Sequence, residues 1–111
     1  PWRSIYKLHL QTDSDELTFV LTSGGHNVGI VNPPGPKARD YRIATSKVAD
    51  RYVDPDTWLA TTPEREGSWW PAWQEWLGRK SSAKTTPPKM GNTENGYPPL
   101  EDAPGTYVLQ R

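Results

Sequence analysis

The chain has 111 residues, and its 13 Lys and Arg balance 13 Asp and Glu, so no net charge draws it to nucleic acid or to an anionic membrane. It contains no cysteine, which excludes disulfides, thiolate zinc sites and a cysteine nucleophile within these residues. Two histidines are too few for a structural zinc site, so we expect no metal.

Few residues of the chain are available to form a hydrophobic core. Hydrophobic residues make up 33% of the chain, whereas prolines number 12 and glycines 9, which predicts few strands, short helices and long irregular segments. Six tryptophans, five tyrosines and one phenylalanine must therefore provide most of the burial. No apolar run is long enough for a transmembrane segment. The start lacks an initiator Met and the pattern of a signal peptide, and we expect a piece of a longer protein.

The first 22 residues predict a helix, a turn and a strand. Residues 1–12 place apolar side chains at helical spacing, and residues 12–16 are a polar turn. Residues 17–22 alternate apolar and polar side chains in β-preferring types, which predicts a strand. Because Val20 is apolar on the otherwise polar side, we expect both faces of this strand to be covered, as in an α/β sheet.

The next segments are shorter. Gly24 and Gly25 end the strand, and residues 28–31 are a second extended candidate, stopped by the prolines at 33, 34 and 36. Residues 41–44 suggest a strand or extended arm. Residues 54–60 predict a helical turn, with Asp54 as N-cap and Pro55 at the first position.

The strongest predicted helix spans residues 68–77, with Ser68 as N-cap and a stop near Gly78. It places three tryptophans on one face, at positions 69, 73 and 76. That face either docks on a core or offers a platform to a ligand. Residues 79–99 predict a flexible linker, whose basic residues at 79, 80, 84 and 89 we interpret as solvated. Residues 106–109 predict a short strand or a docked tail.

His26 is the candidate with a mechanism. It follows two glycines at the end of the predicted strand, a sharp exit that can present an imidazole at the sheet edge, where sites of α/β proteins gather. Such a histidine can act as general base and later as general acid. The alternative is an ordinary histidine in a surface loop. His9 lies near a helix C-terminus, where a cation complements the dipole.

A full catalytic triad cannot be assembled from this chain. No G-x-S-x-G elbow occurs, and Ser23 and Ser68 adjoin a glycine without the elbow spacing. Asp13, Asp15 and Asp102 are candidate orienting acids, but a turn explains the first two and a proline-rich tail explains the third.

Four segments together resemble one family. They are WRSIYK at 2–7, FVLTSGGHNVGIVNPP at 19–34, GSWWPAW at 67–73 and PPLEDAPGTYV at 98–108. In this order they are similar to the C-terminal portion of poly(3-hydroxyalkanoate) synthases, the bacterial polyester polymerases. The succession of G-H-x-x-G-x-V-N-P-P and G-S-W-W-P-x-W is far more specific than any single motif above.

The resemblance implies a fold class, α/β, and a C-terminal fragment of an α/β-hydrolase-type catalytic domain. It implies an acyltransferase with a Cys-Asp-His triad, in which His26 matches the histidine and would activate the cysteine thiol. The cysteine is absent here, and we expect the family's aspartate just upstream of Pro1. We therefore expect the isolated chain to be inactive.

The same resemblance implies partners and a location. The parent would take (R)-3-hydroxyacyl-CoA and the growing polyester, with coenzyme A as part of the substrate and no cofactor. It would form a homodimer and contact the polyester granule surface and granule-associated proteins in the cytoplasm.

The predicted organisation has three segments. Residues 1–34 are a helix-strand unit with the His26 loop, residues 35–78 a wrap ending in the tryptophan helix, and residues 79–111 a flexible loop and tail. Two other functions stay open. One is a non-catalytic module whose tryptophan helix binds a hydrophobic partner, and the other is a fragment of a related α/β-hydrolase esterase. A G-x-C-x-G elbow upstream in the parent gene would favour the polymerase.

Overall fold

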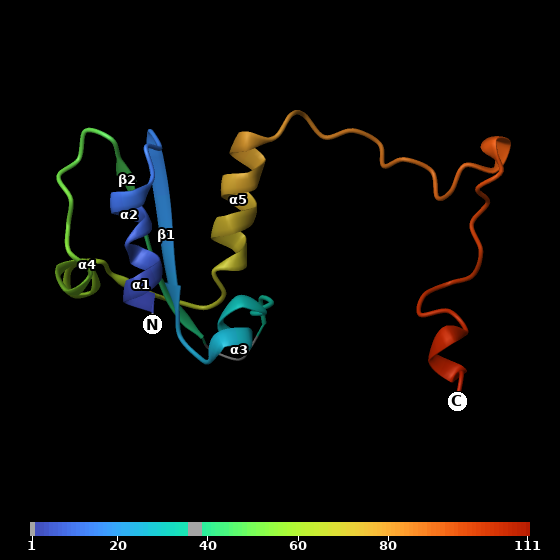
Figure 1. Cartoon of the computed structure of the whole chain (residues 1–111), viewed down its shortest axis with the longest axis horizontal. Helices are drawn as coiled ribbons and strands as arrows, with labels where there is room; N and C mark the ends of the chain where they lie inside the picture. The colour runs from blue at the N-terminus through green and yellow to red at the C-terminus, as the bar shows by residue number, and fades with distance from the viewer. Residues whose placement is uncertain (1, 36–38) are drawn as a thin grey trace. The chain divides into compact units, whose positions relative to one another are not determined.

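The computed structural model describes residues 2–35 and 39–111. The chain forms two compact units, Pro1–Ser81 and Ser82–Arg111, and each is described by itself. Pro1 and Pro36 lie outside the described residues. Eight elements of the first unit follow in chain order (Figure 1): α1 (Trp2–Tyr6), α2 (Leu8–Gln11), β1 (Glu16–Thr22), α3 (His26–Ile30), β2 (Asp40–Lys47), α4 (Pro55–Thr61), β3 (Glu64–Glu66) and α5 (Trp70–Lys80).

The strands form one antiparallel sheet in the order β1-β2-β3. In the β1–β2 register Phe19 lies opposite Ala44, and Val20 lies opposite Ile43. The strands predicted at 17–22 and 41–44 are confirmed as parts of β1 and β2. The sequence did not indicate β3, because its three residues are charged and exposed and show no apolar alternation. Helices packed with this small sheet are compatible with a fragment of an α/β domain.

An aromatic cluster forms the core between the sheet and the helices α1 and α4. Tyr6, Phe19 and Trp58 are 2%, 8% and 6% exposed. The rings of Tyr6 and Trp58 meet Phe19 edge to face, with centroids 5.0 and 5.2 Å away. Aromatic pairs favour this geometry, which adds to the free energy gained by burial. The expectation that aromatic rings carry the burial is confirmed.

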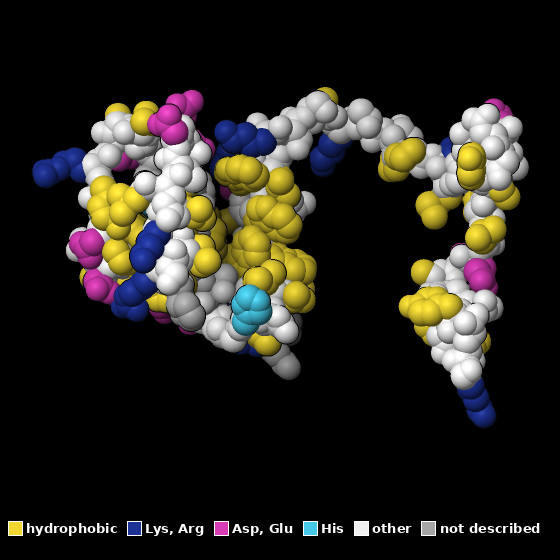
Figure 2. Space-filling view, in the orientation of Figure 1, with side chains coloured by type: hydrophobic (Ala, Val, Ile, Leu, Met, Phe, Trp, Pro, Cys, Tyr) yellow, Lys and Arg dark blue, Asp and Glu magenta, His cyan; other side chains and the backbone are white. Residues whose placement is uncertain are grey.

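The opposite face of β1 is covered by α5 (Figure 1), as the apolar Val20 predicted. Val20 and Ile43 line a groove of about 330 Å³ together with Trp69, Trp73 and Trp76. Figure 2 shows hydrophobic side chains gathered along this helix. The tryptophan face therefore packs toward the sheet, although Trp73 remains 46% exposed.

The helical predictions hold with shifted bounds. The expected helix at 1–12 is split into α1 and α2. The predicted cap of α4 is confirmed, because the Asp54 carboxylate accepts hydrogen bonds of 3.0 Å from the backbone N–H groups of Asp56 and Thr57. The N-cap of α5 is Trp69 rather than Ser68, and the helix passes Gly78 to end at Lys80. Gly78 does not end the helix, because a glycine inside a helix costs only a modest amount of free energy and nothing crowds this position.

The extended segment expected at 28–31 is wrong, since residues 28–30 belong to α3. Backbone N–H groups of Gly29 and Val31 donate to the carbonyl oxygens of Gly25 and Asn27, both at 2.8 Å. A helix this short depends on tertiary contacts, which periodicity does not reveal.

The second unit has little regular structure. It contains two 3-10 helices, η1 (Thr93–Asn95) and η2 (Tyr107–Leu109), and a bridge between Asn92 and Tyr97. The strand considered for 106–109 is wrong, because the N–H of Leu109 donates to the carbonyl of Thr106 and closes a tight turn. Among the described residues, no helix is long and apolar enough to cross a membrane. The three-segment division stays a prediction.

Candidate functional site

The end of β1 is tied to β2 just before the glycine turn. The N–H of Ser23 donates to the carbonyl of Asp40 at 2.9 Å, and the N–H of Asp40 donates to the Ser23 hydroxyl at 3.1 Å. These reciprocal bonds extend the pairing one residue beyond the last strand residue, Thr22. The point at which the chain leaves the sheet is therefore fixed.

The turn itself depends on a glycine. Gly24 has a φ of 97°, which side chains with a Cβ rarely adopt. A Cβ there would also lie 3.1 Å from the Arg39 guanidinium. The chain turns out of the strand at Gly24. Gly25, whose backbone is extended, is the N-cap of α3.

His26 is the first residue of α3, and it is exposed. The sequence placed it in a loop after the strand, and the structure puts it at a helix start immediately beyond the glycine turn. Gly29, three residues later, is buried, and a Cβ at this position would lie 2.4 Å from the Thr22 hydroxyl oxygen. The short helix thus packs directly on the end of β1.

The start of α5 holds the other end of α3. The indole N–H groups of Trp69 and Trp70 donate to the carbonyl oxygens of Gly29 and Ile30, each at 2.9 Å. The Ser68 hydroxyl donates to the carbonyl of Asn32, a residue that is 5% exposed. The sequence pattern predicted a cap at Ser68 and a docking face at Trp69, and it gave no signal for these bonds, which join residues 36 to 40 positions apart.

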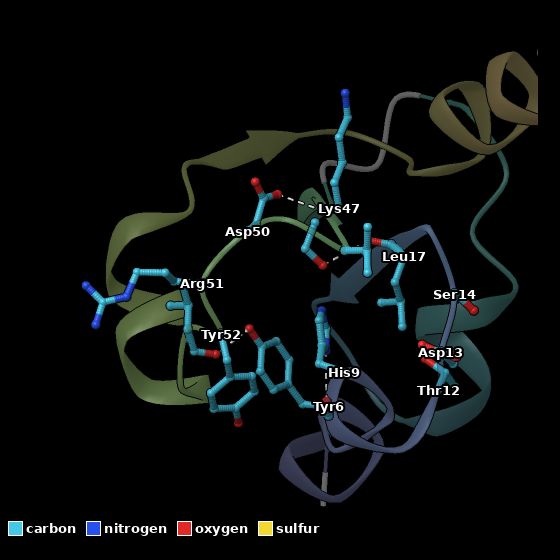
Figure 3. A pocket seen from close by; sticks show the side chains of 13 residues that line it. Tyr6, His9, Thr12, Asp13, Ser14, Leu17, Lys47, Asp50, Arg51 and Tyr52 are labelled. Carbon is cyan, nitrogen blue, oxygen red and sulfur yellow. Dashed lines mark hydrogen bonds between the residues drawn. The ribbon is translucent and has the colours of Figure 1, made fainter.

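His9 occupies a different place, near the end of α2 as expected. Its Nδ1 lies 2.8 Å from the carbonyl oxygen of Tyr6, and its ring stacks on Tyr6 with centroids 4.1 Å apart. Both residues line a cavity of about 180 Å³ between α1–α2 and residues 46–53 (Figure 3). Burial, then the nearby Tyr52 and Asp54, raise the pKa of Tyr6, and its hydroxyl donates to the carbonyl of Val53 at 2.9 Å.

Two of the candidate acids, Asp13 and Asp15, are not brought to His26. Asp13 lines the cavity that His9 also lines, and the carbonyl of Asp15 accepts from Val48 at 3.0 Å. Both precede β1, whereas His26 follows it, so a strand of seven residues, about 23 Å at 3.3 Å per residue, separates them. The third candidate, Asp102, belongs to the second unit, which is described by itself.

Two further features of the sequence are its potential metal ligands and the basic residues from position 79 onward. Among residues 2–35 and 39–111, no three His, Asp or Glu side chains gather closely enough to hold a metal ion. Arg79 and Lys80 are part of α5 rather than of a linker, and Arg79 pairs with Glu75 at 2.7 Å.

No protein-family model matches the chain. Poly(3-hydroxyalkanoate) polymerase 2 of Ectopseudomonas oleovorans is 44% identical over 100% of the chain and 19% of its own length. The polymerase subunit PhaC of Cupriavidus necator is 36% identical over 97% of the chain and 17% of its own length. The subunit PhaC of Rhizobium meliloti is 34% identical over 100% of the chain, again 17% of its own length.

Along its whole length the chain is similar to one part of the poly(3-hydroxyalkanoate) polymerases. The resemblance seen in the sequence motifs is thereby confirmed over the full 111 residues. The chain spans less than a fifth of the length of these polymerases, 17% to 19%. The role of His26 stays a prediction.

Proposed function

We propose that this chain is the C-terminal portion of a poly(3-hydroxyalkanoate) polymerase and contributes to an α/β-hydrolase-type catalytic domain. Support comes from the whole-chain similarity to proteins named as such polymerases and from the ordered motifs around His26 and the tryptophan helix. The β1–turn–α3 unit would be a terminal part of the larger sheet.

The observation that carries the catalytic role is the placement of His26. It begins a helix at the end of a core strand, directly after a glycine with a positive φ, and its side chain is exposed. Because His26 is exposed beyond the last residue of β1, groups supplied by the rest of the polypeptide can reach it. In the proposed triad the remaining polypeptide supplies a cysteine and an aspartate, and His26 is the general base.

The proposed reaction begins at the thioester of (R)-3-hydroxyacyl-CoA. The His26 imidazole takes the cysteine proton, the thiolate attacks the carbonyl carbon, and the bond to the sulfur of coenzyme A breaks. The imidazolium then returns the proton to the departing thiolate of coenzyme A. In the next step the imidazole takes the proton of a 3-hydroxyl group, whose oxygen attacks the carbonyl carbon of the cysteine-bound acyl group. The ester forms as the bond from this carbon to the cysteine sulfur breaks, and the imidazolium returns its proton to the departing cysteine thiolate. Coenzyme A enters with the substrate, so this chemistry needs no cofactor.

The proposal extends to the parent's surroundings. The parent would act as a homodimer in the cytoplasm, on the surface of the polyester granule and beside granule-associated proteins. The polyester product is supported by the relatives, which are poly(3-hydroxyalkanoate) polymerases.

His26 is tested in the full-length polymerase that carries this chain. His26→Ala and His26→Gln are expected to slow coenzyme A release by about 100-fold or more, the contribution of a general base. Polyester formation should slow by the same factor, while the melting temperature stays near wild type. The control is His9→Gln, which changes the chain's other histidine and should keep activity. Granule synthesis at the wild-type rate by His26→Ala would end the assignment.

The same assay separates a polymerase from an esterase. Precipitated polyester and free 3-hydroxy acid are measured beside the released coenzyme A. We expect polyester to account for most of the released acyl groups, whereas an esterase would yield the free acid alone.

A further inference from the structure

Three consecutive residues at the start of α5 donate hydrogen bonds to the C-terminal end of α3 and to the residues that follow it. Ser68, Trp69 and Trp70 give one side-chain hydrogen bond each, and the three carbonyl acceptors lie within residues 29–32. The Ser68 hydroxyl also accepts the backbone N–H of Trp70 at 3.1 Å, which links the bonds to the start of α5. We call residues 68–70 the clamp.

Two of the acceptors, the carbonyls of Gly29 and Ile30, are groups that α3 cannot satisfy by itself. The last four carbonyls of any helix lack a partner in the next turn, and α3 has only five residues. The third acceptor, the carbonyl of Asn32, lies just beyond the end of the helix. A helix of this length is unstable in isolation. Its conformation therefore depends on the clamp at one end and on the contact of Gly29 with Thr22.

The clamp bonds α3 one helical turn away from His26. The bonded carbonyls belong to Gly29 and Ile30, three and four residues after His26 in a helix of only five residues. A tilt or rotation of α3 moves the imidazole together with these two carbonyls. No bond from the clamp reaches His26 itself.

Tryptophan suits this task because it joins a large ring to a single N–H donor. The Trp69 ring packs on Trp73 with centroids 5.3 Å apart and lines the groove against Val20. The donor is thus anchored by the packing of its own ring. Phenylalanine would keep most of that packing and lose only the donor.

We propose that Trp69 and Trp70 are positioning residues for His26, holding α3 so that the imidazole keeps its place at the end of β1. This inference rests on the proposed role of His26. A catalytic group displaced by about 1 Å can lose on the order of 100-fold in rate, so the lost donors should act on turnover rather than on substrate binding.

The test uses the full-length polymerase with Trp69→Phe, Trp70→Phe and both together. Trp76→Phe is the matched control, because it is the same change on the same helix and in the same groove, and among the described residues its indole makes no hydrogen bond to α3. We expect the double variant to lower kcat for coenzyme A release by about 10- to 100-fold. KM should stay within about twofold, and the melting temperature near that of Trp76→Phe. A kcat equal to that of Trp76→Phe would overturn the proposal.

A second measurement asks whether the tryptophans act through His26. In the His26→Ala background, the double tryptophan change should cause no further loss, because the group it positions is gone. An equal fractional loss in both backgrounds would show a purely structural role and overturn the inference. If His26→Ala alone retains activity, the proposed function fails instead, so the two failures are distinguishable.

Discussion

The indole N–H of Trp69 donates to the carbonyl oxygen of Gly29 at 2.9 Å, across 40 residues of sequence. This bond joins the two most specific motifs of the chain, the segment around His26 and the tryptophan-rich start of α5. Gly29 contacts Thr22 on its other side. The short helix α3 is thereby held between the end of β1 and the clamp.

The close approach at Gly29 predicts that Gly29→Ala destabilises the chain. The added methyl group would meet the Thr22 hydroxyl oxygen at 2.4 Å, and such overpacking costs about 1–3 kcal/mol. Urea unfolding of the chain, followed by circular dichroism, measures the loss. Gly78→Ala is the control, because it is helical with nothing within 4 Å, and it should stabilise by about 0.5–1 kcal/mol. Equal midpoints for the two variants would contradict the packing argument.

The cap of α4 predicts a loss of stability in acid. Hydrogen bonds from the Thr57 side chain and backbone, then from the backbone of Asp56, lower the pKa of Asp54. The stabilisation is present above about pH 4, the pKa of an unfolded aspartate, and is lost as the pH falls through the lowered value. Asp54→Ala should therefore lower the urea midpoint at pH 7, and the difference from wild type should shrink below pH 4. A difference that is constant from pH 7 to acid would contradict this account.

The buried Tyr6 predicts the opposite pH dependence. Because its pKa is raised, the folded chain keeps the phenol protonated where the unfolded chain ionises. This stability is present below about pH 10 and is lost as the pH rises through the raised pKa. Tyr6→Phe should lower the free energy of unfolding by about 1 kcal/mol at pH 7, because the hydrogen bond to the carbonyl of Val53 is lost. It should also weaken the loss of stability at alkaline pH. An unchanged alkaline unfolding curve in Tyr6→Phe would contradict the assignment.

The absence of cysteine predicts that the isolated chain has no activity. With no thiol among its 111 residues, the chain cannot form the acyl-cysteine of the proposed reaction. A thiol-detection assay with 3-hydroxybutyryl-CoA should register no coenzyme A above the buffer blank. Turnover by the pure chain would show that it holds chemistry of its own.

The local pattern predicted the long elements well. Strand β1 follows from the alternation of residues 17–22, and the apolar Val20 on its polar side correctly predicted a second covering layer. The cap of α4 follows from Asp54 and Pro55, because both act within one turn. These features depend on neighbours in sequence, which is what periodicity and capping rules describe.

The elements that the sequence did not predict depend on contacts with residues distant in sequence. Helix α3 was mistaken for an extended segment because its apolar run is short and its stability comes from Gly29 against Thr22 and from the clamp. Strand β3 carries no apolar signal and exists through its pairing with β2. For the site, the sequence singled out His26, but it could not show which residues hold its helix.

The most direct test of the central claim is chemical rescue of His26→Ala in the full-length polymerase. Without additive, coenzyme A release from 3-hydroxybutyryl-CoA should fall by about 100-fold or more. Added imidazole should restore part of the rate by replacing the missing base, and it should leave His9→Ala unaffected. Release at the wild-type rate by His26→Ala without imidazole would contradict the account.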